Sequence, residues 1–360
     1  MNQPQPNRSA ARVAVAWLVV LAASAGVSAL MRLLGLPSPE LFGALFVSMT
    51  YAVSGLGPSL TVPGPVSALG QGLIGVSMGS LIQLATLQAL GTHAAVIMAI
   101  NVATLLASLL MGHLFSRLSH VSEATGAFSL IAGGASGVTA IARELGADDR
   151  ITGVVQYLRV LIILVGMPIV TTVIFHPARQ PGAAPGATDV PLGMSLVYVA
   201  ISLAAGGLVT RLTHFPAGWL LGPLFVAGAL STWGVLGPTG VPPLLVSLAY
   251  AVVGLQVGTR FTRSSLAQVG RLLPLALAMI VLIVAVCAGF GLCLSAVTGL
   301  PRLDTYLATT PGGLYAVLAT AAESGADVTF VLAVQVIRLI LVLFSAPFLA
   351  AFYRRRGRVT

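Results

Sequence analysis

Long apolar runs separated by short polar stretches are the dominant pattern of this sequence. In the first half of the chain they cover roughly 12–31, 39–55, 66–82, 92–116, 124–142 and 151–176, and in the second half roughly 192–210, 219–236, 243–260, 272–299, 305–322 and 328–353. Runs of about 17 to 28 residues are long enough for helices to cross a hydrocarbon core of about 30 Å. The apolar residues are continuous rather than alternating, which argues against the strands of a membrane β-barrel. The pattern therefore predicts an all-α, polytopic membrane protein.

A shift of 179 positions places the first half of the sequence on the second, so that Arg32 falls on Arg211 and Gly75 falls on Gly254. A constant offset without gaps indicates a duplicated unit. We predict a polar N-terminal tail (1–11), a first membrane repeat (12–176), a Pro/Gly-rich linker (177–191), a second membrane repeat (192–353) and a basic cytoplasmic tail (354–360). Duplicated membrane units are the usual construction of secondary transporters.

The positions of the arginines discriminate between two topologies. If all twelve apolar segments cross the membrane, nine arginines lie inside and seven outside. If the fifth segment of each half (124–142 and 305–322) enters and returns on the same side, thirteen lie inside and three outside, as the positive-inside rule requires. We therefore predict two inverted repeats, each of about five transmembrane helices plus a re-entrant segment, with both termini on the cytoplasmic side. A different short segment, such as 66–82, is the alternative candidate for the one that does not cross.

Composition supports the membrane interpretation. The 360 residues are 57% hydrophobic and 8% charged, with a mean hydropathy of +1.00, whereas soluble domains average about 25% charged residues. The net charge is +9, and all eighteen basic residues are arginines that lie mostly beside apolar segments. Such arginines set topology and meet anionic headgroups, so no direct nucleic-acid partner is expected. We expect the lipid bilayer and an unidentified small solute as partners, and a homo-oligomer is compatible with the sequence.

The sequence contains no constellation typical of an enzyme. Its five histidines are scattered without neighbouring carboxylates, and P-loop, HExxH and GxSxG motifs are missing. Cys287 and Cys293 are expected to be small buried hydrophobic residues on different faces of one helix. We therefore predict that the protein is not an enzyme and that it has no catalytic residue, no cofactor and no metal site.

The fifth apolar segment of each half contains one glycine-rich interruption near its middle. The interruptions are Gly133-Gly134 in the first copy and Pro311-Gly312-Gly313 in the second, where Thr309 and Thr310 come just before the break. Glycine permits unusual backbone angles and proline removes a donor, so we expect the helix to unwind there. An unwound turn at membrane depth exposes backbone groups that can hold a solute or an ion. The alternative is close helix packing through small residues.

Acidic turns follow the two interruptions, with Glu144 and Asp148 in the first copy and Glu323 and Asp327 in the second. The aspartates have the position of N-caps for the next helix, just after Gly146 and Gly325, which are typical helix ends. The glutamates are not explained by capping.

Paired polar residues lie inside the sixth apolar segment of each half. Gln156 and Arg159, and at the matching positions Gln335 and Arg338, are three residues apart and share a helix face. A buried arginine in a membrane helix costs at least about 2.5 kcal/mol and therefore needs a partner or a polar cavity. One interpretation is an ion pair with the acidic turn of the same copy. The other is that the guanidinium group lines the path of an anionic solute.

These motifs together resemble the AbrB family of bacterial inner-membrane proteins, which are built from an internal duplication. The glycine breaks, the Gly-Ala-Asp turns (146–148 and 325–327) and the Gln-x-x-Arg pairs carry the resemblance, which covers about residues 12–355. The resemblance implies a multi-pass membrane protein of a family described as regulators of gene expression, some members of which are named ammonia monooxygenase. The sparse histidines do not support an oxygenase. The first copy lacks the proline before its glycine pair.

We expect from these features a secondary transporter or exporter of a small, anionic solute that works by alternating access between the two repeats. The alternative is a membrane-embedded regulator of the AbrB type that influences gene expression indirectly, for instance through the level of an inducer. No DNA-reading element is visible in the sequence.

Overall fold

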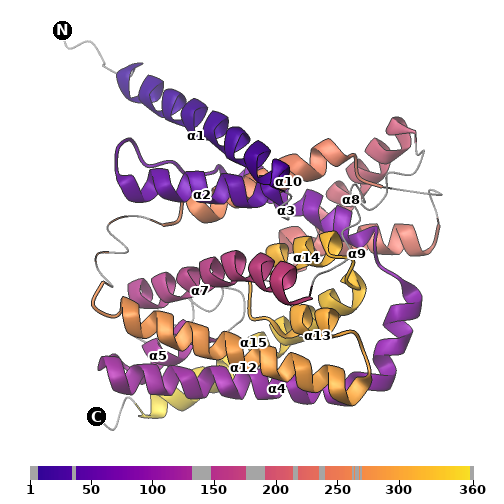
Figure 1. Cartoon of the computed structure of the whole chain (residues 1–360). Coiled ribbons are helices and arrows are strands. Elements are labelled where there is room, and N and C mark those ends of the chain that lie inside the picture. The colour runs from indigo at the N-terminus through magenta and orange to yellow at the C-terminus, as the bar shows by residue number, and fades with distance from the viewer. Residues whose placement is uncertain are drawn as a thin grey trace. The chain divides into compact units, whose positions relative to one another are not determined.

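The computed structural model describes residues 7–34, 38–131, 147–175, 191–213, 218–234, 240–261, 263, 267 and 270–356. All regular elements in this part of the chain are helices (Figure 1). In chain order they are α1 (Asn7–Leu33), α2 (Pro39–Ser54), α3 (Gly64–Gly79), α4 (Leu84–Ser119), α5 (Glu123–Leu130), α7 (Asp149–Val170), the π-helix η1 (Thr171–Phe175), α8 (Leu192–Thr213), α9 (Gly218–Thr232), α10 (Pro243–Gly258), α12 (Leu273–Thr298), α13 (Arg302–Thr309), α14 (Leu314–Glu323) and α15 (Val328–Arg356).

Five helical segments in the described residues are long and apolar enough to cross a membrane. They are Ala11–Leu33, Leu90–Ser119, Ile151–Phe175, Leu192–Thr213 and Leu273–Thr298. Large apolar side chains are exposed on these helices, for example Leu18 (67%) and Leu212 (72%). In water such exposure would be unfavourable, whereas in lipid it is the expected state. The chain is a multi-pass helical membrane protein, as the apolar pattern predicts.

The fifth apolar segments differ from the continuous helices around them. In the second copy, the segment is divided into α13 and α14, with residues 310–313 between them. In the first copy, α5 ends at Leu130, and residues 132–146 lie outside the described residues. The predicted interruption is therefore confirmed in the second copy, where it falls on the Pro-Gly-Gly motif.

The first compact unit comprises Met1–Ser80, Ala183–His214 and Gly218–Ala267. Its closest helix pairs are α3 with α9 and α2 with α10, so helices from one half of the sequence pack on helices from the other. A methyl group added at Gly75 would collide with the carbonyl oxygen of Leu220, and one added at Gly254 would collide with that of Leu41. Glycine at these crossings lets the backbones approach, which is the usual basis of helix association in lipid.

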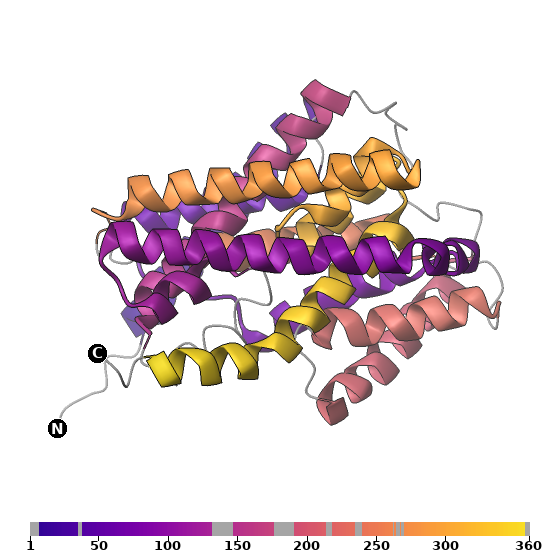
Figure 2. The same cartoon turned by 90° about the horizontal axis from the view of Figure 1, so that it is seen from below.

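The second compact unit comprises Leu81–Gly182, Phe215–Ala217 and Gln268–Thr360. The long helices α4 and α12 contact each other and run alongside in Figure 2, and each also carries a short helix, α5 on α4 and α13 on α12. The helices α7 and α15 hold these short helices from the other side. Phe115, Val155 and Ile280 belong to the apolar core of this unit.

The two compact units do not coincide with the two halves of the sequence. Each unit takes corresponding helices from both halves: α1–α3 with α8–α10 in the first unit, and α4, α5 and α7 with α12–α15 in the second. The predicted repeats (12–176 and 192–353) and their inverted orientation remain predictions from the sequence. The spatial grouping of helices is a separate feature that the offset of 179 positions does not reveal.

Candidate functional site

The break between α13 and α14 produces two short helices in place of one span. The helices have 8 and 10 residues, which corresponds to lengths of about 12 and 15 Å, well short of a bilayer core of about 30 Å. Helix α13 ends at Thr309, and the N–H of Thr310 still bonds to Tyr306 O at 3.0 Å. Pro311 cannot donate, so the last carbonyl groups of α13 need partners from elsewhere.

Gln335 and Arg338 on α15 supply these partners. Gln335 Nε2 donates to Leu307 O (3.0 Å) and Thr310 O (3.1 Å). Arg338 Nη1 donates to Thr309 O (3.3 Å) and Thr310 O (3.0 Å). Arg338 Nη2 also donates to Gln335 Oε1. The two side chains thus form one connected group that closes the C-terminal end of α13.

Gln156 and Arg159 on α7 do the same for the end of α5 in the first copy. Gln156 Nε2 donates to Phe128 O (2.7 Å), and Arg159 Nη1 donates to Leu130 O (3.0 Å) and Ile131 O (2.9 Å). The glycines of this break, Gly133 and Gly134, and the acidic Glu144 lie outside the described residues.

The donors and acceptors at the end of α5 are each 179 positions before the donors and acceptors at the end of α13. The three acceptors of the first copy, Phe128, Leu130 and Ile131, correspond to Leu307, Thr309 and Thr310 in the second. The duplication therefore covers a network of specific hydrogen bonds as well as the helices that carry it.

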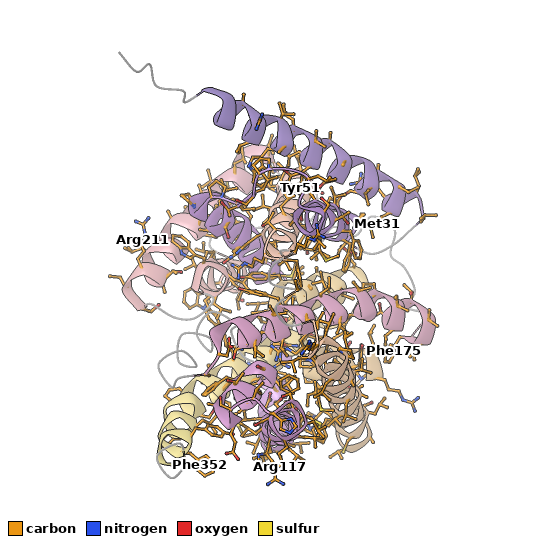
Figure 3. The ribbon with its side chains drawn as sticks, turned by 90° about the vertical axis from the view of Figure 1, so that its left-hand side faces the viewer. Met31, Tyr51, Arg117, Phe175, Arg211 and Phe352 are labelled. Carbon is orange, nitrogen blue, oxygen red and sulfur yellow. The ribbon has the colours of Figure 1, made fainter. Side chains whose placement is uncertain are left out.

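Arginine is suited to this position for a physical reason. The last carbonyl groups of a helix lack intrahelical partners and carry a partial negative charge of about half a unit. In lipid no bulk water can satisfy them. Hydrogen bonds from a charged donor contribute about 1.5–3 kcal/mol each. Arg159 and Arg338 are only 4% and 6% exposed, whereas Arg117 and Arg211 project outward from their helices in Figure 3.

The acidic turns have a different role from the ion pairs considered for them. Asp148 Oδ1 accepts from Ile151 N (3.2 Å) and Asp327 Oδ1 accepts from Phe330 N (3.0 Å), so both aspartates are N-caps, as predicted. In the described part of the chain, the partners of Arg159 and Arg338 are carbonyl groups and Gln335. In the second copy, capping of the helix end replaces the ion-pair interpretation. In the first copy, Glu144 lies outside the described residues, so its pairing with Arg159 stays a prediction from the sequence.

Gly325 ends helix α14 as the sequence indicates. Its φ of 71° lies in the left-handed region that glycine adopts without strain. Ala326 N then bonds to Ala321 O at 3.0 Å, the closure expected for this kind of helix end. Glu323 is the last residue of α14 and is half-buried.

The two networks differ in one respect. In the first copy, Arg159 Nε and Gln156 Oε1 are buried and have no hydrogen-bond partner among the described residues. In the second copy, Gln335 Oε1 accepts from Arg338. A buried polar atom without a partner costs about 1–3 kcal/mol, and more when it is charged. The first copy thus holds a donor and an acceptor that are ready for an additional group.

Cys287 on α12 is a site residue that the sequence did not single out. It is buried, it lies beside the side chain of Thr104 on α4, and it is within electrostatic range of both Arg159 and Arg338. The offset of 179 positions would have paired it with Ser108, which is also buried. Cys293, expected to be buried, is exposed because a separation of six residues points it to another face of α12.

An open groove of about 800 Å³ lies in the first compact unit. It is formed mainly by apolar side chains of α1 and the segment after α2, together with Arg12 and Tyr51. The predicted solute-path residues that the structure describes are not among its lining residues. An apolar surface groove on a membrane helix is readily filled by lipid, so the groove is not the candidate site.

Comparison with known proteins places these features in a family. The sequence matches the family described as "Transition state regulatory protein AbrB" over residues 49–354. It is 30% identical over 317 residues to the Escherichia coli (strain K12) protein named "Putative regulator AbrB", which covers 88% of this chain and 90% of that protein. It is 28% identical over 360 residues to "Uncharacterized protein YhjN" of Bacillus subtilis (strain 168), covering 94% and 92% of the two chains. Both Gln-x-x-Arg pairs lie within the matched region.

Proposed function

This chain belongs to the AbrB family, and on that premise we propose that it is a secondary transporter or exporter of a small anionic solute. The observation that supports the proposal is the pair of short helices, α5 and α13, whose C-terminal ends are held by buried glutamine and arginine side chains. Broken helices with charged groups at membrane depth are typical of solute paths in transporters built from repeats.

The charge of the site favours an anion. Two guanidinium groups carry two positive charges, and two helix ends contribute about half a negative unit each, so about one positive charge is left. An anionic solute would compensate this charge, whereas a cation would increase the repulsion.

Alternating access is the proposed mechanism. The sequence repeats would have inverted orientations, so that each break faces a different aqueous side in turn. The protein would lie in the bacterial inner membrane with both termini in the cytoplasm. We propose no enzymatic chemistry and no cofactor, because the scattered histidines offer no catalytic constellation.

The test is transport by the purified protein in liposomes loaded with labelled organic anions, neutral solutes or cations. We expect flux of at least one anion and its reduction by about tenfold or more in Arg159→Gln. Arg211→Gln is the matched control, because Arg211 lies over the ring of Trp219 on the surface of the first unit. Absence of flux for every anion would reject the proposal, as would equal loss of flux in the two variants.

The proposed topology is tested by labelling single cysteines. Asp148→Cys and Ala326→Cys, in a chain whose Cys287 and Cys293 have been replaced by serine and alanine, are treated with a membrane-impermeant thiol reagent in intact cells. Asp148 is chosen because its side chain is exposed, whereas the neighbouring Ala147 is buried. The inverted arrangement predicts that only one of the two positions reacts from outside. Reaction of both from outside would support twelve crossings instead.

A regulatory role is the second candidate, and the name of the E. coli relative is the observation that favours it. The effect on gene expression would be indirect, through a cytoplasmic partner or through the level of an inducer. Recovery of one transcription regulator in a fixed ratio to the protein, with no flux in liposomes, would favour this role over transport.

A further inference from the structure

We propose that the helix end of the first copy, at Gln156 and Arg159, is the recognition site for a 2-hydroxycarboxylate. The inference rests on the proposed function, since it names the class of anion that the transporter would carry. It starts from two atoms of the first copy, Gln156 Oε1 and Arg159 Nε, that have no hydrogen-bond partner in the part of the chain that the structure describes. Gln156 is 0% exposed and Arg159 is 4% exposed.

These two atoms define what a ligand must offer. Arg159 Nε–H requires an acceptor, and the guanidinium charge makes a carboxylate the strongest one, through parallel N–H···O bonds. Gln156 Oε1 requires a donor. A single solute that satisfies both therefore carries a carboxylate and a hydrogen-bond donor.

The distance between the two side chains limits the length of the solute. Residues three apart on a helix have Cβ atoms about 5–6 Å from each other. A carboxylate and a donor on adjacent carbon atoms match such a spacing. A long dicarboxylate would place its second charge well beyond Gln156.

The surrounding charge decides the nature of the donor. Arg338 acts electrostatically on Arg159, so the site already holds two cations that repel each other. An ammonium donor would add a third positive charge beside them. A hydroxyl donor is neutral, so a 2-hydroxycarboxylate is favoured over an amino acid.

The second copy provides the internal comparison. There Gln335 Oε1 already accepts from Arg338 Nη2, and all capping bonds of the first copy recur. Because Gln335 Oε1 already accepts from Arg338, it is not available to a donor of the ligand. The same two residue types, glutamine and arginine, thus leave two atoms without a partner among the described residues at one helix end and bond to each other at the other.

The experiment measures binding to the full-length protein in lipid nanodiscs by calorimetry. The probes are lactate, propionate, alanine and lactamide, which differ in the hydroxyl, in the ammonium group and in the carboxylate. We expect lactate to bind about tenfold more tightly than propionate, and alanine and lactamide to bind more weakly than propionate. Equal affinity of the wild type for lactate and propionate overturns the inference without any variant.

Two matched variants locate the effect. In Gln156→Met the ratio of the lactate and propionate affinities should fall to about one, whereas in Gln335→Met it should stay near ten. Arg159→Lys should weaken both carboxylates together by about tenfold, because lysine lacks the paired donors. An unchanged ratio in Gln156→Met, or an equal change in both glutamine variants, shows that Gln156 does not specifically recognise the hydroxyl group and overturns the inference.

The outcome is separable from that of the proposed function. If lactate binds with the expected dependence on Gln156 but no anion crosses liposomes, the inference stands and transport fails. If another anion is transported and the lactate preference is missing, transport stands and the inference fails.

Discussion

In the first compact unit, helices approach through glycine, as Gly75 of α3 does at the carbonyl group of Leu220 on α9. In the second unit, α7 and α15 hold the short helices α5 and α13 through glutamine and arginine side chains. The first kind of contact depends on shape and the second on charge. Glycine packing also occurs in the second unit, where Gly126 of α5 meets the backbone of Gly112 on α4. The buried charge, which is expensive in lipid, is therefore what marks the second unit as a functional region.

The largest loss of stability is expected when a charged cap of the second unit is removed. Arg338→Leu leaves the carbonyl group of Thr309 without its side-chain donor, and we expect the free energy of unfolding to fall by about 3 kcal/mol. Arg211→Leu in the first unit should change it by less than about 0.5 kcal/mol. Unfolding in micelles, followed by circular dichroism, measures both. Equal effects would show that the buried charge has no special structural role.

The glycine contacts of the first unit are tested by adding one methyl group. Gly75→Ala forces the new methyl into the backbone of Leu220, and we expect a loss of about 2 kcal/mol. Gly26→Ala in α1 is the control, because nothing lies within 4 Å of the added methyl. If both variants unfold at the same temperature, close packing is not what holds α3 to α9.

The difference between the open and closed helix ends predicts unequal effects of the two glutamines. Gln335→Leu loses two carbonyl partners and the contact with Arg338, whereas Gln156→Leu loses one carbonyl partner. We expect Gln335→Leu to be more destabilising by about 1 kcal/mol. Thermal unfolding of the two variants side by side gives this difference, and a reversed order would contradict the assigned networks.

The smallest expected difference concerns the N-caps. Asp148→Ala and Asp327→Ala each remove an acceptor from the first turn of a helix, which costs about 1 kcal/mol. Asp327 also accepts from Thr86 Oγ1 at 3.0 Å, and we expect this contact to contribute about 0.5 kcal/mol to the loss in Asp327→Ala. Thr86→Val should abolish that extra loss in a double-mutant cycle, and additive effects would exclude the contact.

Local features of the sequence predicted much of the helical structure. The apolar run 39–55 became α2 (Pro39–Ser54), and the Pro-Gly-Gly motif produced the break after Thr309. Both depend on the chemistry of neighbouring residues. The spacing of Gln335 and Arg338 correctly indicated a shared face, since both reach the same helix end.

The acceptors of the arginines could not be predicted in the same way. Leu130 and Ile131 are bound through their carbonyl groups, which every residue has, so no side-chain pattern marks them. The sequence suggested nearby carboxylates as partners of the arginines, because residues of opposite charge can be recognised in a sequence, whereas the carbonyl groups at the end of a helix cannot. The position of Cys287 near both arginines was also not predicted, because these neighbours belong to helices that are distant in the sequence.

The grouping of helices has a consequence for biosynthesis. The first unit needs α10, which ends at Gly258, so it stays unfinished until long after α4 and α7 have left the ribosome. The cap of α5 by Arg159, in contrast, joins residues that are made close together in time. A nascent chain halted before α8 would therefore contain a completed arginine-capped helix end, whereas its glycine-lined helix α3 would still lack the partner α9.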